Sequence, residues 1–272
     1  KELKQEWEER ELRDEMQRKD DVISFLSQPV INDFTFGYLI NPNHTCDIGK
    51  TQLLFVIPSA PENFENRAMV RKGGKARYVK VKGNNAKMLF FLGMPAASSN
   101  DSEKTQTRVL EESATHGDIV QLDFEDVYRN ILLKAISMLR WASTFCRRTT
   151  YVIRTDDDVW IRVAKVRSVL ESTSRKHKDF ILGDRKDGWA PHRVRESKYY
   201  VSEADYPQST FPPFAVGGLL GYPISTVSLL YQAAVRLEPL WLDDVFITGL
   251  CAPKVNVPLV SDPDFKFWHR MW

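Results

Sequence analysis

The sequence predicts an α/β fold in which a mostly parallel central sheet is flanked by helices. Short apolar runs that are typical of strands buried on both faces recur along the chain. Segments with apolar residues at helical spacing lie between these runs. Because strands and helices alternate, right-handed crossovers and parallel pairing of the strands are expected.

The composition is that of a folded chain without a bulk charge bias. Of the 272 residues, 43% are hydrophobic and 11% are aromatic, which is enough for one large α/β domain or two small ones. The 38 basic and 36 acidic residues leave a formal net charge of +2, so neither nucleic acid nor an anionic membrane is indicated as a partner. No apolar run approaches the ~18 residues of a membrane-spanning helix.

The predicted elements follow one another along the chain. Residues 1–33 are mostly charged with sparse apolar side chains, which indicates a helical stem or tail, and residues 34–272 are expected to form the main domain. Asp126 is expected to cap a strongly amphipathic helix that leads into the strand beginning at Tyr151. Further helices are expected at residues 163–170 and 225–236, and buried strands at residues 52–58, 87–93, 119–122, 151–153 and 180–183.

Three consecutive aspartates, Asp156, Asp157 and Asp158, follow the predicted strand that begins at Tyr151. Adjacent carboxylates repel one another and are costly to bury unless they are paired or bound to a metal. Their hard oxygen ligands select Mg²⁺, Mn²⁺ or Ca²⁺. In parallel sheets ligands bind beyond the carboxyl ends of the strands, which is where this run lies. A solvated acidic turn is the alternative.

Two other clusters of charge lie at positions that suit binding or catalysis. Arg67 and Arg71 are four residues apart on one helix face, just after the first buried strand. Two guanidinium groups suit a diphosphate, although a surface pair is an equally simple explanation. Asp243 and Asp244 open a predicted helix that runs through Cys251. Acidic residues at a helix N-terminus are also common for dipole reasons alone.

A polar, aromatic and basic stretch runs from Asp184 to Pro213. An irregular segment of this length is uncommon inside a domain unless it binds something. Its aromatic faces suit sugar rings, although they also suit ordinary interface packing. The paired glycines Gly217 and Gly218 follow, and they allow either close approach of the backbone to a ligand or a sharp turn.

Taken in order, these pieces resemble the inverting β-1,3-galactosyltransferase and N-acetylglucosaminyltransferase group, glycosyltransferase family 31, which includes Fringe-like enzymes. The resemblance covers about residues 34–257. Each piece is weak, and the ordered set is specific. The matching pieces are Leu53-Leu54-Phe55 with Arg67 and Arg71, Phe91-Leu92-Gly93, Gly117-Asp118-Ile119 through Asp126 to Lys134, Trp141 and Cys146, Tyr151 to Val159, Lys198 to Val201, Pro212 to Tyr222, and Asp243-Asp244-Val245 with Gly249.

The resemblance implies a GT-A, Rossmann-like fold and a manganese-dependent hexosyltransferase. Such an enzyme moves a hexose or N-acetylhexosamine from a UDP-sugar to a hydroxyl of a glycan on a glycoprotein or glycolipid, with inversion and a β-1,3 linkage. It also implies a type II membrane protein of the Golgi lumen, with residues 34–272 as a C-terminally truncated catalytic domain and the membrane anchor missing from this chain. The alternatives are a catalytically inactive relative that binds glycans or nucleotides, and a metal-dependent phosphohydrolase.

The resemblance also assigns roles to individual residues. Asp156–Asp158 match the DxD motif, and Asp243–Asp244 match the motif that supplies the catalytic base, with Asp244 favoured over Asp243. The expected Mn²⁺ ligands are Asp158, Asp156 and His269, and the residues expected on the UDP-sugar side are Arg67, Arg71, Asp156 and Asp157.

The chain departs from the family pattern in two places, and its cysteines follow it in part. Lys72-Gly73-Gly74 replaces the Thr-Trp that follows the second arginine, and the chain ends at Trp272, soon after His269. By resemblance, Cys46 and Cys146 form a disulfide bond, and Cys251 has lost a partner that would lie beyond the end.

Overall fold

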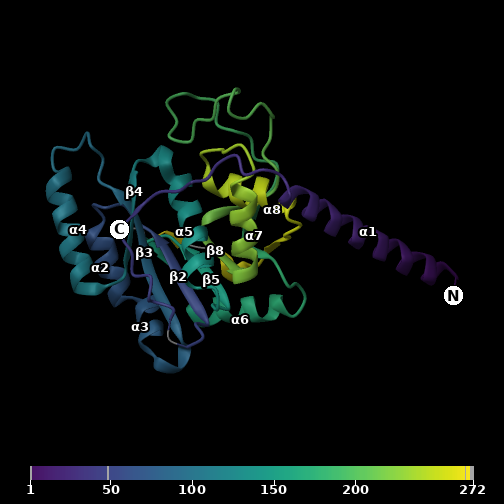
Figure 1. The fold of residues 1–272 in the computed structure, drawn as a ribbon, viewed down its shortest axis with the longest axis horizontal. Helices are drawn as coiled ribbons and strands as arrows, with labels where there is room; N and C mark the ends of the chain where they lie inside the picture. The colour runs from purple at the N-terminus through teal and green to yellow at the C-terminus, as the bar shows by residue number, and fades with distance from the viewer. Residues whose placement is uncertain (1, 48, 267, 270–272) are drawn as a thin grey trace.

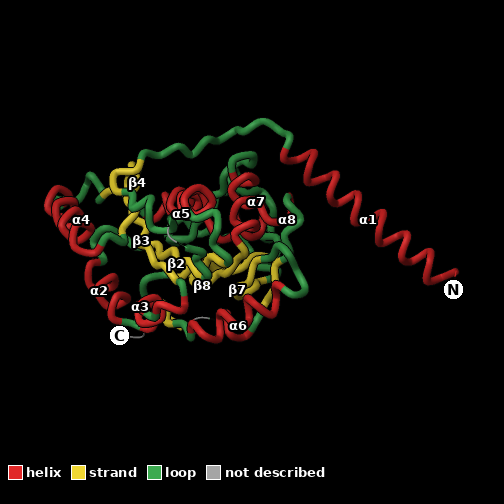
Figure 2. The backbone as a smooth tube through the Cα atoms, turned by 60° about the horizontal axis from the view of Figure 1, so that its bottom comes forward, coloured by secondary structure: helices red, strands yellow, loops and turns green. Residues whose placement is uncertain are grey.

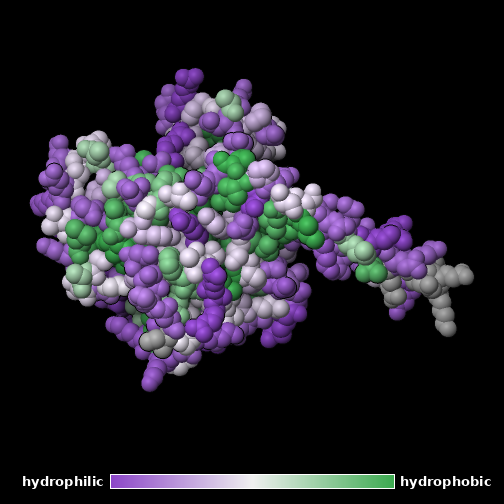
Figure 3. Space-filling model, in the orientation of Figure 1, coloured by the Kyte–Doolittle hydropathy of each residue, from purple (hydrophilic) through white to green (hydrophobic). Residues whose placement is uncertain are grey.

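The computed structural model describes residues 2–47, 49–266 and 268–269. Helix α1 (Glu2–Leu26) projects away from a body that holds all the other elements (Figure 1). Its visible side chains are mostly hydrophilic (Figure 3), and Phe25 near its C-terminal end is buried in the core of the body. In the described part of the chain, no helix combines the length and the apolar character that a membrane crossing requires.

One eight-stranded sheet forms the centre of the body, in the order β1-β4-β3-β2-β5-β8-β7-β9. The four strands β4, β3, β2 and β5 pair in parallel, as do β7 and β9, whereas β1 and β8 run antiparallel to their neighbours. This arrangement confirms the predicted α/β class with a mostly parallel sheet. The strands are β1 (Tyr38–Ile40), β2 (Leu53–Pro58), β3 (Ala86–Met94), β4 (Ile119–Glu125), β5 (Tyr151–Thr155), β7 (Ile181–Lys186), β8 (Phe214–Pro223) and β9 (Leu259–Ser261).

Helices cover both faces of the sheet, with α5 and α7 on one face and α3 and α6 on the other (Figure 2). A π-helical turn, η3, packs beside β8 and α7. The bounds of these elements are α2 (Phe64–Lys72), α3 (Gly74–Lys80), α4 (Ser102–His116), α5 (Ile131–Phe145), α6 (Val163–Ser174), α7 (Ile224–Ala234), η3 (Val245–Cys251) and α8 (Ala252–Lys254).

The side chains of β2 alternate between two hydrophobic cores. Leu53, Phe55 and Ile57 pack with residues of α2, α4 and α6, whereas Leu54 and Val56 pack with α5 and α7. A strand that is buried on both faces needs apolar side chains at every position. The continuous apolar run that predicted this strand therefore follows from its place in the middle of the sheet.

The prediction that Asp126 caps the amphipathic helix is wrong. Helix α5 begins five residues later and is preceded by Asn130, which makes no side-chain cap. Asp126 instead accepts a hydrogen bond of 2.8 Å from the backbone N–H of Gly93 and forms an ion pair of 2.8 Å with Lys134. A buried lysine one turn inside the helix attracts the carboxylate more strongly than the helix terminus does.

The three cysteines divide as the resemblance implied. Cys46 and Cys146 form a disulfide bond that ties the loop after β1 to the end of α5. Cys251, at the end of η3, is a buried thiol. The disulfide bond therefore links the loop beside the edge strand β1 to helix α5, which covers one face of the sheet.

Candidate active site

The three aspartates form a turn at the carboxyl end of β5, in the middle of the sheet. The turn separates β5 from the short strand β6 (Val159–Trp160). The backbone N–H of Val159 donates to the carbonyl of Asp156 at 3.3 Å, and the N–H of Asp156 donates to the carbonyl of Gly218 on β8 at 3.2 Å. The acidic run therefore lies at the sheet edge where a ligand was predicted.

Asp157 is the anchor of this acidic turn. Its carboxylate accepts hydrogen bonds from Ser59 Oγ at 2.6 Å, Asn66 Nδ2 at 3.1 Å and Asn63 Nδ2 at 3.2 Å. These three donors follow β2, the neighbouring strand, and they were missed by the sequence reasoning although they lie just beyond its carboxyl end. Because both oxygens of Asp157 are engaged, its predicted contact with the sugar donor stays a prediction.

A buried guanidinium joins the acidic turn to the second acidic cluster. Arg154 lies on β5, is 5% exposed, and approaches Asp243 with 2.7 Å between Nη1 and Oδ2. This contact is an ion pair and not a hydrogen bond, because Asp243 Oδ2 has no hydrogen-bond partner among the described residues. Arg154 Nε also lacks such a partner there. The same positive charge also acts on Asp156 and Asp244. The two clusters predicted to share a site are therefore coupled through one cation.

Burial raises the pKa of Asp156 to about 6, although Arg154 opposes the change. The neighbouring carboxylates of Asp243, Asp158 and Asp157 raise it further. Burial disfavours the charged form of a carboxyl group, and neighbouring carboxylates add to this effect. This electrostatic environment suits a bound cation.

Gly217 makes room for the guanidinium of Arg154. A Cβ atom at this position would lie 2.7 Å from Nη1 and 2.9 Å from Nη2 of Arg154. The paired glycines lie inside β8, so the sharp turn considered for them is absent and the close approach is to a side chain. The backbone N–H of Gly217 also donates to the carboxylate of Asp244.

Asp244 is held by two backbone N–H groups, those of Val245 at 2.8 Å and of Gly217. Burial is the main cause that raises the pKa of Asp244 to about 7, and the nearby charge of Asp243 adds to the shift. A carboxylate with this pKa suits proton transfer near neutral pH. Asp243, in contrast, is engaged with Arg154. The assignment of Asp244 as the base stays a prediction.

Asp243 and Asp244 both line a cavity of about 370 Å³ that has six aromatic residues in its walls. The irregular segment between β7 and β8 supplies part of these walls, which explains its aromatic composition. The rings contact one another edge to face, with centroids 5.7 Å apart for Tyr128 and Trp241 and 6.1 Å apart for Tyr128 and Tyr199. The aromatic residues that line the cavity are Tyr128, Trp189, Tyr199, Phe211, Phe214 and Trp241.

Arg67 and Arg71 are engaged in ion pairs with neighbouring elements. Arg67 is fully buried, pairs with Glu112 of α4 at 2.7 Å and donates to two backbone carbonyls. Arg71 pairs with Glu112 and, at 2.7 Å, with Asp118 just before β4. These contacts tie α2 to α4 and to the start of β4. The diphosphate contact stays a prediction, and it would have to displace these carboxylates.

Two of the predicted metal ligands, Asp156 and Asp158, lie in the turn before β6, and His269 belongs to the strand that pairs with β6. The backbone of His269 in β10 (Trp268–His269) pairs with Val159, the residue after Asp158. The side chain of His269 lies outside the described part of the chain. Among the side chains that are described, no three of His, Cys, Asp or Glu are grouped to hold an ion. The carboxylate oxygens of the acidic turn are nevertheless donors of the kind that a divalent cation such as Mn²⁺ prefers.

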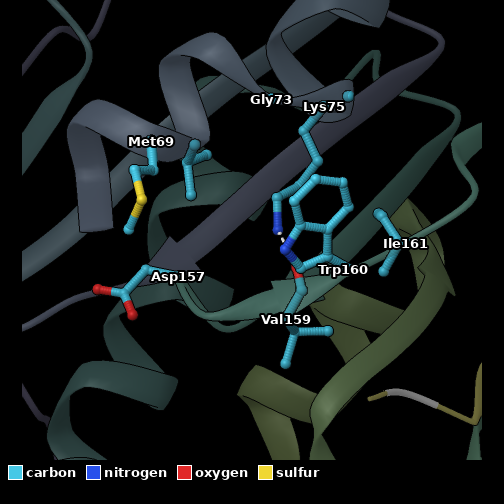
Figure 4. Close-up of a pocket in the computed structure, with 9 residues that line it drawn as sticks. Met69, Gly73, Lys75, Asp157, Val159, Trp160 and Ile161 are labelled. Atoms are coloured by element: carbon cyan, nitrogen blue, oxygen red, sulfur yellow. Dashed lines mark hydrogen bonds between the residues drawn. The ribbon is translucent and has the colours of Figure 1, made fainter. Parts of the chain in front are cut away.

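A second cavity includes a residue of the acidic turn in its walls (Figure 4). It is lined by Gly73 and Gly74 at the junction of α2 and α3, by Asp157, and by Trp160 and Lys75. Burial lowers the pKa of Lys75 to about 8 against the pull of the three aspartates, so its ammonium is charged at neutral pH. The departure from the family pattern at residues 72–74 therefore lies beside the acidic turn.

Comparisons with known proteins point to one family. A family model described as Galactosyltransferase matches residues 65–263. Lactosylceramide 1,3-N-acetyl-beta-D-glucosaminyltransferase of Rattus norvegicus is 34% identical over 224 residues, which are 81% of this chain and 59% of that protein. The protein of the same name from Homo sapiens is 33% identical over 226 residues, or 82% and 59% of the two chains. Beta-1,3-galactosyltransferase 5 of Gorilla gorilla gorilla is 32% identical over 247 residues, or 89% and 79%.

The chain spans about three fifths of the length of the curated relatives that it matches first. The family model nevertheless covers most of the body, from α2 to the segment after β9, and includes both acidic clusters. The α/β architecture, with an acidic turn at the end of a central parallel strand, is that of the GT-A fold implied by the sequence motifs. The chain therefore belongs to the galactosyltransferase family, glycosyltransferase family 31.

Proposed function

We propose that this chain transfers N-acetylglucosamine or galactose from a UDP-sugar to a hydroxyl of a glycan acceptor and forms a β-1,3 linkage with inversion. The observation that carries the proposal is that the buried Arg154 interacts with both acidic clusters. In the proposal, the acidic turn binds the UDP-sugar, and the cluster of Asp243 and Asp244 supplies the catalytic base. The names of the relatives, which are 1,3-N-acetyl-beta-D-glucosaminyltransferases and a beta-1,3-galactosyltransferase, support the linkage and both donor sugars.

In this proposal Asp244 is the general base. Its carboxylate takes the proton of the acceptor hydroxyl as the oxygen attacks the anomeric carbon, and one base opposite the leaving group gives inversion. The two backbone N–H groups hold the carboxylate in place. The aromatic cavity beside Asp244 suits the apolar face of an acceptor sugar ring.

On the donor side, Asp158, Asp156 and His269 would hold Mn²⁺, which when bound supplies positive charge for the departing diphosphate. Asp157 keeps the turn in position through Ser59, Asn63 and Asn66. We also place the full-length protein in the Golgi lumen as a type II membrane protein that acts on a glycoprotein or glycolipid glycan. The disulfide between Cys46 and Cys146 supports an oxidising compartment.

A UDP-release assay tests the proposal. The chain is incubated with Mn²⁺, a β-linked glycan acceptor and each of UDP-galactose, UDP-N-acetylglucosamine and UDP-N-acetylgalactosamine, and the products are analysed by mass spectrometry. Acceptor-dependent release of UDP with a product one sugar heavier supports it. Binding of UDP or glycan without turnover with any donor would establish the alternative of an inactive relative.

The rate of transfer is expected to fall as the pH is lowered below about 7. The pKa of Asp244 is raised to about 7, so at lower pH the carboxyl is protonated and cannot accept the acceptor proton. A bound cation nearby favours the ionised form and moves the midpoint to lower pH. The measurement is kcat/KM between pH 5 and 9, with UDP binding followed over the same range to separate donor binding from chemistry. A rate that rises toward pH 5 contradicts the role of Asp244.

Replacing Asp158 with Ala is expected to weaken Mn²⁺-dependent UDP binding by at least ~10–100-fold, because a direct carboxylate ligand is lost. Asp187→Ala is the matched control, since it removes the same charge from an exposed ion pair with Arg185. Calorimetry of UDP binding with and without Mn²⁺ provides the measurement. If Asp158→Ala binds UDP as tightly as the unaltered chain does in both conditions, Asp158 holds no metal.

A further inference from the structure

Lys75 of helix α3 is a buried cation whose ammonium group contacts the backbone of the acidic turn. It is the second residue of α3 and is 6% exposed. Its side chain extends from the helix past the indole of Trp160 to the carbonyl of Val159 (Figure 4). Gly73 and Gly74 lie next to it at the junction of α2 and α3 and line the same cavity.

The ammonium of Lys75 reaches both ends of the turn. Its Nζ donates to the carbonyl of Val159 at 2.8 Å and lies 3.4 Å from the carbonyl of Asp156 and from Thr155 Oγ1. The backbone bond from the N–H of Val159 to the carbonyl of Asp156 closes the same turn. Lys75 therefore holds together the residues on either side of the carboxylates.

The partners of Lys75 within hydrogen-bond distance are carbonyl and hydroxyl oxygens, while Asp156, Asp157 and Asp158 act on it over a longer range. A buried ammonium is costly unless nearby negative charge compensates for it. The acidic turn supplies that charge. A methionine of similar length would fill the same space without this cost, so the position of Lys75 indicates an electrostatic role.

We propose that Lys75 is a built-in counter-ion of the acidic turn, which fixes residues 155–159 in one conformation and offsets part of their negative charge before any cation binds. Its charge then opposes the entry of a divalent cation. The turn keeps other anchors, namely the three donors on Asp157 and the strand pairings on both sides. Removing the charge of Lys75 is therefore expected to strengthen cation binding more than any loosening of the turn weakens it. The effect of Lys75 on cation entry rests on the cation site of the proposed function.

The first test needs no metal. Hydrogen exchange of the segment from Asp156 to Trp160 is measured by mass spectrometry in the metal-free chain and in Lys75→Met. Exchange is expected to be faster by about tenfold in the variant, because the turn loses the ammonium that bonds its two carbonyls. Lys80→Met is the matched control, since Lys80 lies on the same helix and is exposed. Unchanged exchange in Lys75→Met overturns the clamping role.

The second test measures Mn²⁺ affinity by calorimetry at one ionic strength. Lys75→Met is expected to bind Mn²⁺ about tenfold more tightly than the unaltered chain, because a fixed positive charge near the ion is gone. Lys80→Met is expected to bind with unaltered affinity, because solvent screens an exposed charge. Weaker or equal binding in Lys75→Met overturns the counter-ion role. If the unaltered chain binds no Mn²⁺, the proposed metal dependence fails, and the exchange experiment still decides whether Lys75 clamps the turn.

Lys75→Gln separates charge from hydrogen bonding, and it replaces Lys75→Met if that variant does not fold by circular dichroism. Its amide can still donate to a carbonyl but carries no charge. Tighter Mn²⁺ binding with an exchange rate closer to that of the unaltered chain is the expected result. Equal Mn²⁺ affinity in Lys75→Gln and the unaltered chain would show that the charge of Lys75 does not act on the cation site.

Discussion

Asp244→Asn is expected to lower kcat by about 10²–10⁴-fold while donor binding survives, because the variant loses the general base and keeps its shape. The amide oxygen of Asn can still accept the hydrogen bond from the N–H of Val245, which Asp244 accepts at 2.8 Å. The fold is expected to gain stability at high pH, since the pKa of Asp244 is raised to about 7 and its ionised form is therefore disfavoured in the folded state. This gain is full above pH 7 and disappears as the pH falls toward 4.

Steady-state kinetics, UDP calorimetry and thermal unfolding of Asp244→Asn provide these measurements. Asp243→Asn is the matched control, since it changes the neighbouring carboxylate but leaves Arg154 without its ion-pair partner. We expect that control to lose stability. If Asp244→Asn keeps near-normal turnover, or if a stable Asp243→Asn loses more activity, the two aspartates have the opposite roles.

The sequence alone was sufficient for the strands β2, β3, β4, β5 and β7 of the sheet and for recognising both acidic clusters. Leu53 and the residues after it could be recognised because a strand buried on both faces has a continuous apolar pattern. The acidic run was recognised because three adjacent carboxylates are unfavourable without a partner. The order of strands and helices then placed that run at a carboxyl edge. These are local or topological properties, which can be recognised from one sequence without knowing which distant residues are in contact.

The contacts inside the site depend on residues far apart in the chain, and no spacing rule indicated them. Asp156 and Asp157 are neighbours in one acidic run, yet the charge of Arg154 acts on Asp156, whereas Asp157 accepts three hydrogen bonds. Glu112 comes from a separate helix and engages both Arg67 and Arg71, which in the sequence have the spacing of a diphosphate clamp.

The strand β8 was also missed for a physical reason. Its paired glycines were interpreted as a sharp turn or as a close approach of the backbone to a ligand, because glycine permits both. In the structure the absence of a side chain at Gly217 accommodates the guanidinium of Arg154 from the neighbouring strand. The packing of Arg154 against Gly217 therefore outweighs the low preference of glycine for strands. This requirement can be recognised only when the neighbouring strand β5 is known.

Arg154→Met is expected to destabilise the fold by about 3–5 kcal/mol, which is the usual cost of removing one partner of a buried ion pair. Asp243 would lose its 2.7 Å partner, and Asp156 would lose the positive charge that opposes its protonation. Urea unfolding at pH 8 measures the effect. Arg185→Met is the matched control, because Arg185 also pairs with an aspartate at 2.7 Å but on the surface, where such pairs contribute about 0–1 kcal/mol.

The pH dependence and a double variant separate the loss of charge from the loss of packing. As the pH falls toward 5, Asp156 takes up a proton more readily without Arg154, because the positive charge that lowers its pKa is gone, so the deficit of Arg154→Met is expected to narrow. Adding Asp243→Asn to Arg154→Met should recover part of the lost stability, since it removes one of the uncompensated charges. A deficit that is the same at pH 5 and pH 8, and that Asp243→Asn does not relieve, would mean that Arg154 acts by filling space and does not couple the two acidic clusters.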